Sequence, residues 1–297
     1  MITIVKLHKL LVLAASIVAG CTTMNLDLPA VSDVPTGTRA SGSVVWHDLL
    51  TNDPEGSRRF YSALFGWEFE RPGLNVGFGD GSGYMLIRHN GELVGGMVDA
   101  NQLGREGNIS QWITVISVED IDAAVDAVRS QNGTVLTPPT ELPTRGTLAV
   151  AADPEGAIFA LVRTRDGDPP EREPVLNGWI WNELWTNEVD HAADFYRSVA
   201  GYSVELPRNL QPVNEYRVMK TDGRPRVGLM DNPFGGEVTP VWVNYIRVED
   251  PAAITARVEQ LGGRVIVEAR PRSVGGTAAF IAGPSGAGIA LQTWPLE

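Results

Sequence analysis

An internal repeat runs through this chain and points to a duplicated architecture. The octapeptide WHDLLTND at 46–53 returns as WNELWTNE at 181–188, an offset of 135 residues, and later matches follow at an offset of 130. The further matching pairs share aromatic, acidic and turn residues: 60–61 with 195–196, 118–120 with 248–250, and 153–157 with 283–287. We therefore predict two homologous domains, 42–165 and 178–297. The polar, proline-rich segment 166–177 between them is predicted to be a linker.

Both domains follow the same order of predicted elements. In the first, the strand at 44–50 leads to Asp53-Pro54, a favourable N-cap and first helical residue, and Gly66 suits a left-handed C-cap. Three short strands follow, and a strand at 113–118 then begins a second copy of the same order. Each domain is thus predicted to be α+β, a pair of βαβββ modules with helices on one sheet face. Because each has its own caps and apolar stripes, we expect 177–297 to fold alone.

An aspartate at the end of the first strand, with Phe-Tyr seven residues on, resembles the vicinal oxygen chelate superfamily (glyoxalase, bleomycin-resistance and dioxygenase-like proteins). In particular, the sequence resembles bacterial proteins with two tandem glyoxalase-like domains, whose halves begin Trp-His-Glu-Leu and Trp-Asn-Glu-Leu. It implies that each domain is a curled sheet with helices on its outer face. Reactions differ widely within this superfamily, which includes metal-dependent enzymes and metal-free proteins that only sequester a ligand.

In the metal-dependent members, His, Glu or Gln ligands come from the first and fourth strands of each module. The corresponding positions that can be identified in this chain carry Trp46, Ile113, Ala160, Trp181, Val243 and Ala290. None of these side chains is a donor for a divalent ion, so the sequence predicts no metal and no cofactor. His47 is the weak candidate, since a one-residue slip in register would turn it to the ligand face. The alternative for His47 is a hydrogen-bonded histidine at a sheet–helix interface.

The expected concave faces carry aromatic and charged residues instead. The candidate ligand-binding residues are Trp46, Asp48, Trp181, Glu183, Trp185, Tyr245 and Arg247. Such a set suits a small organic ligand with a flat apolar body and a polar group. Three alternatives stay open. The aromatic residues fill the sheet as core with Glu183 paired to Arg247, as in an envelope interaction protein with closed pockets. Glu183 is the base of a metal-free isomerase. Or the chain is a metal-dependent lyase, isomerase or dioxygenase.

The N-terminus has the pattern of an export signal. Lys6 and Lys9 precede the apolar run LLVLAASIV at 10–18, and Val-Ala-Gly-Cys follows, ending at Cys21, the only cysteine. This stretch resembles the bacterial lipobox, which implies a signal peptide at 1–20, acylation of Cys21 and a tether at 21–41. Since Thr22 rather than Asp follows, the resemblance implies an outer-membrane lipoprotein facing the periplasm, with membrane lipid as its partner.

Charge excludes one class of partner. The chain has 24 Lys and Arg against 36 Asp and Glu; the first 20 residues hold two lysines and no acid, so the mature part carries a formal charge of 22 − 36 = −14. Binding to phosphate backbones requires a basic face, which argues against nucleic acid. The internal duplication supplies a pairing that single-domain relatives obtain by dimerising, so we expect a monomer.

Overall fold

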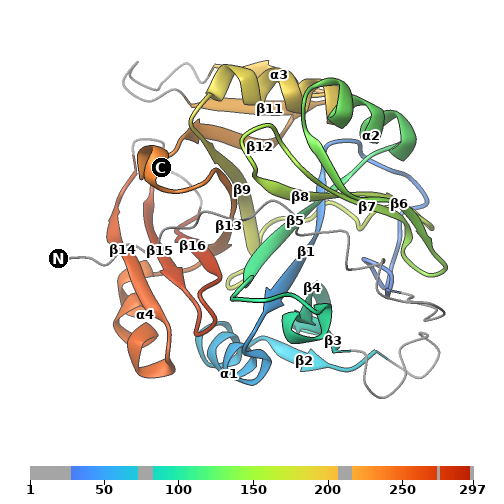
Figure 1. Ribbon diagram of the computed structural model, residues 1–297. Coiled ribbons are helices and arrows are strands. Elements are labelled where there is room, and N and C mark those ends of the chain that lie inside the picture. The colour runs from blue at the N-terminus through green and yellow to red at the C-terminus, as the bar shows by residue number, and fades with distance from the viewer. Residues whose placement is uncertain (1–27, 73–82, 207–215, 273–274, 295–297) are drawn as a thin grey trace.

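The computed structural model describes residues 28–72, 83–206, 216–272 and 275–294 (Figure 1). The expected signal peptide at 1–20 and Cys21 lie outside these ranges. Within the described part of the chain, no helix has the length and apolar character needed to cross a membrane.

Each half builds one eight-stranded sheet. The first half contains β1 Val44–Thr51, α1 Pro54–Phe65, β2 Glu68–Glu70, β3 Tyr84–His89, β4 Glu92–Asp99, η1 Ala100–Leu103, β5 Gln111–Ser117, α2 Ile121–Ser130, β6 Thr134–Leu142, β7 Gly146–Ala152 and β8 Ile158–Thr164. The second half contains β9 Trp179–Thr186, α3 Val189–Ala200, β10 Ser203–Glu205, β11 Arg217–Thr221, β12 Arg224–Asp231, η2 Gly235–Glu237, β13 Val241–Arg247, α4 Pro251–Val258, η3 Glu259–Leu261, β14 Arg264–Pro271, β15 Thr277–Ala282 and β16 Gly288–Gln292.

The two sheets have the same topology. Their strand orders are β2-β3-β4-β1-β5-β8-β7-β6 and β10-β11-β12-β9-β13-β16-β15-β14. In each, the first strands of the two modules pair antiparallel in the centre (β1 with β5, β9 with β13), and the fourth strand of each module runs parallel to its first. The sheets are curled, with helices on their outer faces (Figure 1). The predicted α+β class and paired βαβββ modules are confirmed.

Local signals in the sequence account for the helix ends. The Asp53 carboxylate accepts a hydrogen bond from the backbone N–H of Gly56, and Asp120 does the same for Ala123 at the start of α2. Gly66 ends α1 at φ 71°, in the left-handed region where glycine has no Cβ clash. These caps fix both ends of α1 and the start of α2, and they therefore also fix where the flanking strands begin or end.

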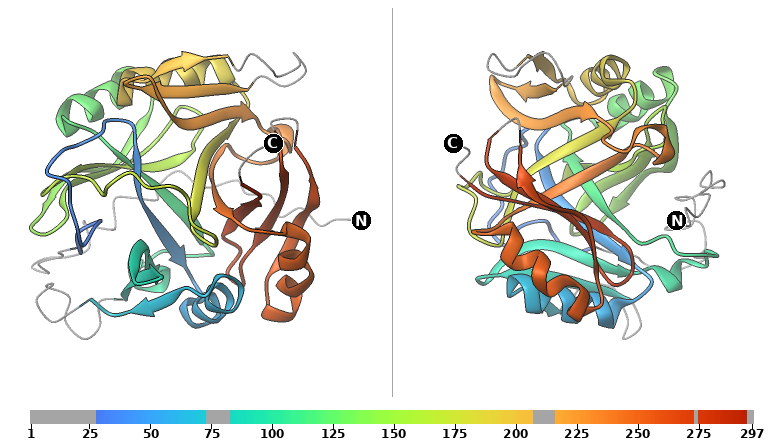
Figure 2. Two further views of the ribbon diagram at one scale, coloured as in Figure 1. Left: turned by 180° about the vertical axis from the view of Figure 1, so that it is seen from behind. Right: turned by 90° about the vertical axis from the view of Figure 1, so that its left-hand side faces the viewer.

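The outer faces of the two sheets pack against each other. Helix α2 lies beside α3, and α1 lies beside α4, in every view (Figures 1 and 2). One apolar cluster joins Phe159 of β8 to Phe195 and Tyr196 of α3, and another joins Phe60 of α1 to Ile246 of β13. Each half therefore covers the other's helices, because an apolar helix face must be buried somewhere. The expectation that 177–297 folds alone stays a prediction, although both of these apolar clusters contain residues of the two halves.

Equivalent residues of the repeat meet where the halves join. His47 Nε2 and Asn182 Oδ1 are 2.7 Å apart, and Thr114 Oγ1 donates to Asn244 Oδ1 at 2.7 Å. The His47 ring also stacks on Trp179, with ring centroids 4.0 Å apart. His47 thus faces away from the concave side, as alternation from Trp46 predicts. Its surroundings are an interface between two sheets rather than the sheet–helix interface expected from the sequence.

Candidate functional site

On the first concave face, a partly buried carboxylate and a fully buried guanidinium are joined through a tyrosine. Asp48 Oδ1 of β1 accepts from Trp46 Nε1 at 2.9 Å and from the Tyr84 hydroxyl at 2.7 Å. Arg145, in the β6–β7 hairpin, donates to Asp48 Oδ2 at 3.1 Å and to the Tyr84 oxygen at 2.7 Å. Arg145 is 1% exposed and also lies over the Trp46 ring, 5.1 Å from its centroid. We call these four side chains the first polar cluster.

The chain's own N-terminal segment covers this cluster. Val31 is buried among the apolar side chains of the concave face, and Leu28 packs against the same cluster. The backbone oxygen of Pro29 accepts a hydrogen bond from Arg145 Nε at 2.8 Å. The first concave face is therefore closed by residues that precede β1.

The second concave face repeats this chemistry around Glu183 of β9. The Glu183 carboxylate is fully buried and accepts from the Tyr216 hydroxyl at 2.8 Å, the Tyr245 hydroxyl and Trp185 Nε1 at 3.4 Å. Arg272, which follows β14, donates to Glu183 Oε1 at 2.8 Å. We call these five side chains the second polar cluster. A carboxylate, a tyrosine and an arginine from corresponding strands and hairpins thus recur in both halves.

The second face opens into a pocket. Its volume is about 90 Å³, and aromatic, aliphatic and arginine side chains line it: Trp185, Met230, Pro233, Tyr245, Val267, Arg270, Arg272, Ala278, Ala279, Phe280 and Ala290. The Trp185 ring meets the Phe280 ring at a centroid distance of 5.0 Å and a 56° interplanar angle. Glu183 is not among the lining residues, because Tyr245 and Arg272 separate its carboxylate from the pocket.

The tyrosines and arginines of both clusters keep their ordinary charge states at neutral pH. Burial raises the pKa of the Tyr84, Tyr216 and Tyr245 hydroxyls, and the neighbouring carboxylates raise it further, so these hydroxyls remain neutral donors. Burial alone would lower the pKa of Arg272, but the Glu183 carboxylate more than offsets this and the pKa is raised. The guanidinium therefore stays charged at the edge of the pocket.

The structure brings most of the sequence-predicted residues together. Trp46 and Asp48 belong to the first polar cluster; Glu183, Trp185 and Tyr245 belong to the second, and Trp181 Nε1 donates to the Tyr216 hydroxyl at 3.0 Å. These residues lie on the faces that strand alternation predicts.

Arg247 is the exception. It is the last residue of β13, where the linker crosses the end of the strand, and its guanidinium donates to the Pro174 carbonyl oxygen. Arg247 does not line the pocket with the other candidate ligand-binding residues, and it does not form the pair with Glu183 that one of the alternatives required. Arg272 takes that place. Sequence reasoning missed Arg145 and Arg272, because both lie in hairpins without the periodicity that aligns strand residues.

The positions implied for metal ligands do not fit a metal. Trp46, Ile113 and Ala160 pack together in the apolar cluster of the first concave face, and Val243, Ala290 and Trp181 do so in the second. Among the described residues, no group of three or more His, Cys, Asp or Glu side chains lies together. Each polar cluster also already holds one guanidinium against its carboxylate, a positive charge that would repel a divalent cation.

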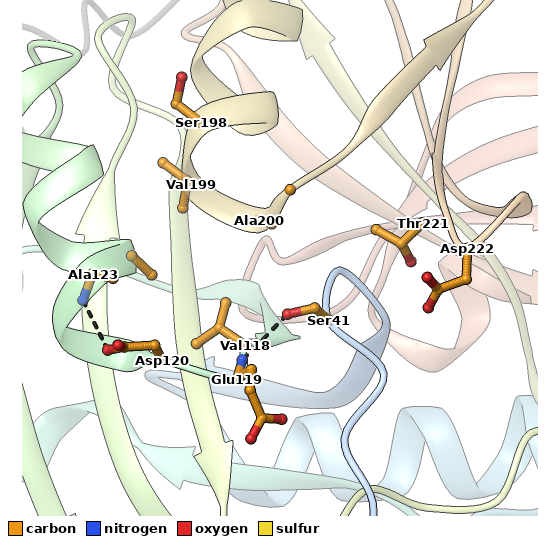
Figure 3. Close-up of a pocket in the computed structure, with 12 residues that line it drawn as sticks. Ser41, Val118, Glu119, Asp120, Ala123, Ser198, Val199, Ala200, Thr221 and Asp222 are labelled. Carbon is orange, nitrogen blue, oxygen red and sulfur yellow. Dashed lines mark hydrogen bonds between the residues drawn. The ribbon is translucent and has the colours of Figure 1, made fainter.

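A larger hollow of about 300 Å³ lies elsewhere, between the start of α2 and the end of α3 (Figure 3). Its acidic residues include Glu119, Asp120 and Asp222. The Asp120 carboxylate caps α2 by accepting from Ala123 N–H, and the backbone N–H of Glu119 donates to Ser41 Oγ at 3.2 Å. These contacts hold the ends of secondary-structure elements, and the hollow lies on the helix side rather than on a concave face.

Comparison with known proteins places the chain in a family. Residues 43–161 match the model of the Glyoxalase/Bleomycin resistance protein/Dioxygenase superfamily. The chain is 32% identical over 246 residues to CFP32 of Mycobacterium tuberculosis, provisionally named a glyoxylase, covering 83% of this chain and 92% of that protein. It is 30% identical over 275 residues to the anthracycline biosynthesis protein DauV of Streptomyces sp. strain C5, covering 85% and 93%. The protein belongs to the glyoxalase/bleomycin-resistance/dioxygenase superfamily.

Solved structures share the fold at low sequence identity. The Mn(II)-bound glyoxalase from Novosphingobium aromaticivorans superposes with a TM-score of 0.55 at 15% identity, covering 86% of this chain and 83% of that one. At this identity the likeness supports the tandem domain fold and carries no information about the site.

Proposed function

We propose that the protein binds a small planar organic molecule, without a metal, in the pocket on the second concave face. The observation that supports this most directly is the pocket itself, in which the rings of Trp185 and Phe280 meet beside the charged Arg272. Flat apolar groups pack on such rings, and a guanidinium binds an anionic or carbonyl substituent. At about 90 Å³ the pocket holds one ring of a ligand rather than a whole extended molecule.

The contacts of Glu183 favour binding over acid–base catalysis. Its two oxygens already accept from Tyr216, Tyr245, Trp185 and Arg272, and the carboxylate does not line the pocket. A general base must come within hydrogen-bond reach of the proton it removes. Glu183 instead holds Arg272 and Tyr245 at the pocket wall, so the proposal gives it a positioning role rather than the role of an isomerase base.

The name of one relative fits this ligand class. DauV is named for anthracycline biosynthesis, and anthracyclines contain fused planar rings. A metal-dependent reaction is the rival function, supported by the family name and by the Mn(II)-bound neighbour. The residues at the implied ligand positions argue against a metal-dependent reaction, since indole, valine and alanine side chains offer no donor for a divalent ion.

The test is a titration with anthraquinone-2-sulfonate, a planar anion, in the presence of EDTA. We expect saturable quenching of tryptophan fluorescence that Trp185→Phe reduces and that Phe280→Ala weakens by about 0.5–1.5 kcal/mol through the lost ring contact. Trp294→Phe is the matched control, because Trp294 is an exposed tryptophan outside the pocket. Quenching that survives Trp185→Phe unchanged would place the ligand elsewhere, and stoichiometric metal after purification without chelators would favour the rival function.

We further propose that the protein is a monomeric lipoprotein of the cell envelope, attached through acylated Cys21 and facing the periplasm from the outer membrane. The basic start, the short apolar run and Val-Ala-Gly-Cys support this. The pairing of equivalent residues across the halves supports a monomer. Cys21→Ser should abolish incorporation of labelled palmitate and release of the signal peptide; labelling that persists in the Cys21→Ser protein would contradict the attachment.

A further inference from the structure

We infer that Leu28–Asp33 is an intramolecular ligand, and that it occupies a second binding site on the first concave face. The site would take an aliphatic molecule that carries a carbonyl or carboxylate group. This inference goes beyond the pocket of the second half and does not depend on what that pocket binds.

The contacts of the segment resemble those of a bound ligand. The Pro29 carbonyl oxygen accepts from Arg145 Nε at 2.8 Å, while the terminal nitrogens of the same guanidinium hold Asp48 and the Tyr84 oxygen. Val31 is 4% exposed and packs among aliphatic residues of the face. One polar acceptor and one branched apolar side chain thus fill the polar and apolar parts of the site.

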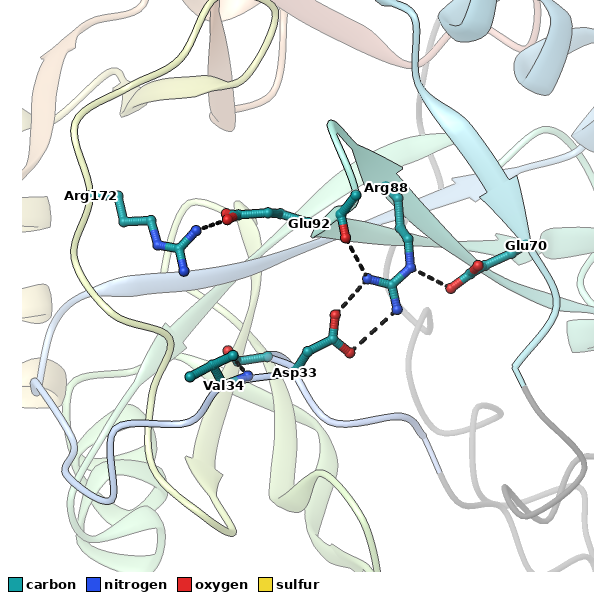
Figure 4. Close-up of polar contacts among 8 residues, drawn as sticks. Asp33, Val34, Glu70, Arg88, Glu92 and Arg172 are labelled. Carbon is teal, nitrogen blue, oxygen red and sulfur yellow. Dashed lines mark hydrogen bonds and ion pairs between the residues drawn. The ribbon is translucent and has the colours of Figure 1, made fainter.

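The outer end of the segment is fastened by ion pairs at the surface. Asp33 binds Arg88 through both oxygens, at 2.5 and 3.3 Å, and Arg88 Nε also contacts Glu70 at 2.5 Å (Figure 4). Both carboxylates are about half exposed, and ion pairs of this kind contribute little to stability because water and salt screen them. Val34, the next residue, is 63% exposed and lies outside the face. The fastening is therefore easily released.

No backbone ladder holds the segment in place. Residues 28–33 contain no strand, so they are not part of the sheet that they cover. The second concave face has the same kind of carboxylate–tyrosine–arginine cluster and yet leaves a pocket beside Arg272. The polar cluster therefore does not require a covering segment, and Leu28–Asp33 acts as an occupant rather than as an element of the fold.

The occupant defines the chemistry of a competing ligand. Such a molecule must offer an oxygen acceptor to Arg145 Nε in place of Pro29, and a branched aliphatic group in place of Val31. A short peptide or a branched acyl compound meets both requirements. A peptide with the sequence of the segment itself, Leu-Pro-Ala-Val-Ser-Asp, is the best matched probe.

The experiment measures fluorescence anisotropy of this labelled hexapeptide with the whole mature chain. The unaltered protein should bind it weakly, because its own segment occupies the site. Val31→Asp places a charge in the apolar part of the site, so the segment should leave and peptide affinity should rise at least tenfold. Val34→Asp is the matched control, since the same charge three residues on lies in solvent and should leave affinity unchanged.

A second change tests the polar contact. Arg145→Lys in the Val31→Asp background keeps the positive charge but removes Nε as donor to the carbonyl, and should weaken peptide binding severalfold. Val31→Ala serves where Val31→Asp does not fold, with a smaller rise expected. Equal affinity for the unaltered, Val31→Asp and Val31→Ala chains would overturn the inference, as would binding that Arg145→Lys leaves unchanged. Phe280→Ala changes the other pocket and should not alter peptide binding, which separates this result from failure of the proposed function.

Discussion

The two concave faces contain the same kind of polar cluster but differ in whether a pocket lies beside the cluster. Each places a carboxylate of the first strand, Asp48 or Glu183, against a tyrosine and an arginine. In the first face, Arg145 is sealed beneath residues 28–31; in the second, Arg272 borders a pocket. The repeated part is therefore the polar cluster that shapes the sheet, whereas the segment that covers one copy is what makes the halves different.

This difference bears on what a duplicated fold can do. In each face a guanidinium lies beside the carboxylate and over an aromatic ring, Arg145 over Trp46 and Arg272 over Tyr245. The chain's own residues cover one of the two copies, while the other borders a pocket. The outer faces, which carry the helices, do not differ between the halves in this way, because each half buries the apolar helix surface of the other.

The largest effect is expected from separating the halves. A fragment of residues 178–297 loses α2, which packs on α3, and α1, which packs on α4. Because this exposes two apolar clusters, the fragment should show no cooperative unfolding transition by circular dichroism. The control is the complete chain cut at a protease site inserted at 166–177, whose halves should stay associated. A cooperative transition in the isolated fragment would show that the second half packs independently after all.

A smaller effect is expected when the carboxylate of each polar cluster is neutralised, and the loss of stability should differ between the two clusters. Asp48→Asn leaves Arg145, whose side chain is fully buried, without its counter-ion, and should cost about 3–5 kcal/mol of unfolding free energy. Glu183→Gln should cost less, because the Arg272 side chain is 14% exposed and can turn to solvent through the pocket. Urea denaturation measures both, and Glu70→Gln at the surface should change stability by at most about 1 kcal/mol. A Glu183→Gln loss as large as that of Asp48→Asn would contradict the difference in access.

The sequence predicts the orientation of a residue where that residue belongs to a periodic pattern or to a helix cap. The repeat, the caps at Asp53 and Asp120 and the alternation of strand residues predicted the fold and placed Trp46 inward and His47 outward. Hairpin geometry has no such period, so Arg145 and Arg272 could not be assigned to the clusters. Arg247 was misplaced because alternation does not reveal where a strand ends and the linker crosses it.

Contacts between distant segments were also beyond prediction. The apolar helix stripes predicted burial but did not identify the partner, which is the other half of the chain. Residues 22–41 have the composition of a tether, and only packing shows that Val31 is buried in the first concave face. Both features depend on complementary surfaces, which a single stretch of sequence does not contain.

The smallest effect concerns His47 and Asn182, equivalent positions that meet as different residues. Burial lowers the pKa of His47 to about 4 from 6.5, although the hydrogen bond with Asn182 and the charge of Asp48 raise it in part. Between pH 6.5 and 4 the unfolded chain therefore binds a proton that the folded chain does not, so His47 makes stability fall as the pH falls through this window, by at most about 3 kcal/mol.

Asp153, whose counterpart is Gly283, acts in the opposite direction. Burial raises its pKa from 3.8 to about 6, so the folded chain binds the extra proton and stability rises as the pH falls from 6 towards 4. His47→Asn removes only the first effect. The unfolding free energies of the unaltered chain and of His47→Asn are each measured from pH 7 to 4, and the second is subtracted from the first. The contributions of Asp153 and of all other shared titratable groups cancel in this difference. The difference should decrease steadily below pH 6.5. Thr114→Val is the control, because it removes the other hydrogen bond between equivalent positions and no titratable group, and it should give a flat difference. A flat difference for His47→Asn as well would mean that His47 is reached by water and is not sealed between the two sheets.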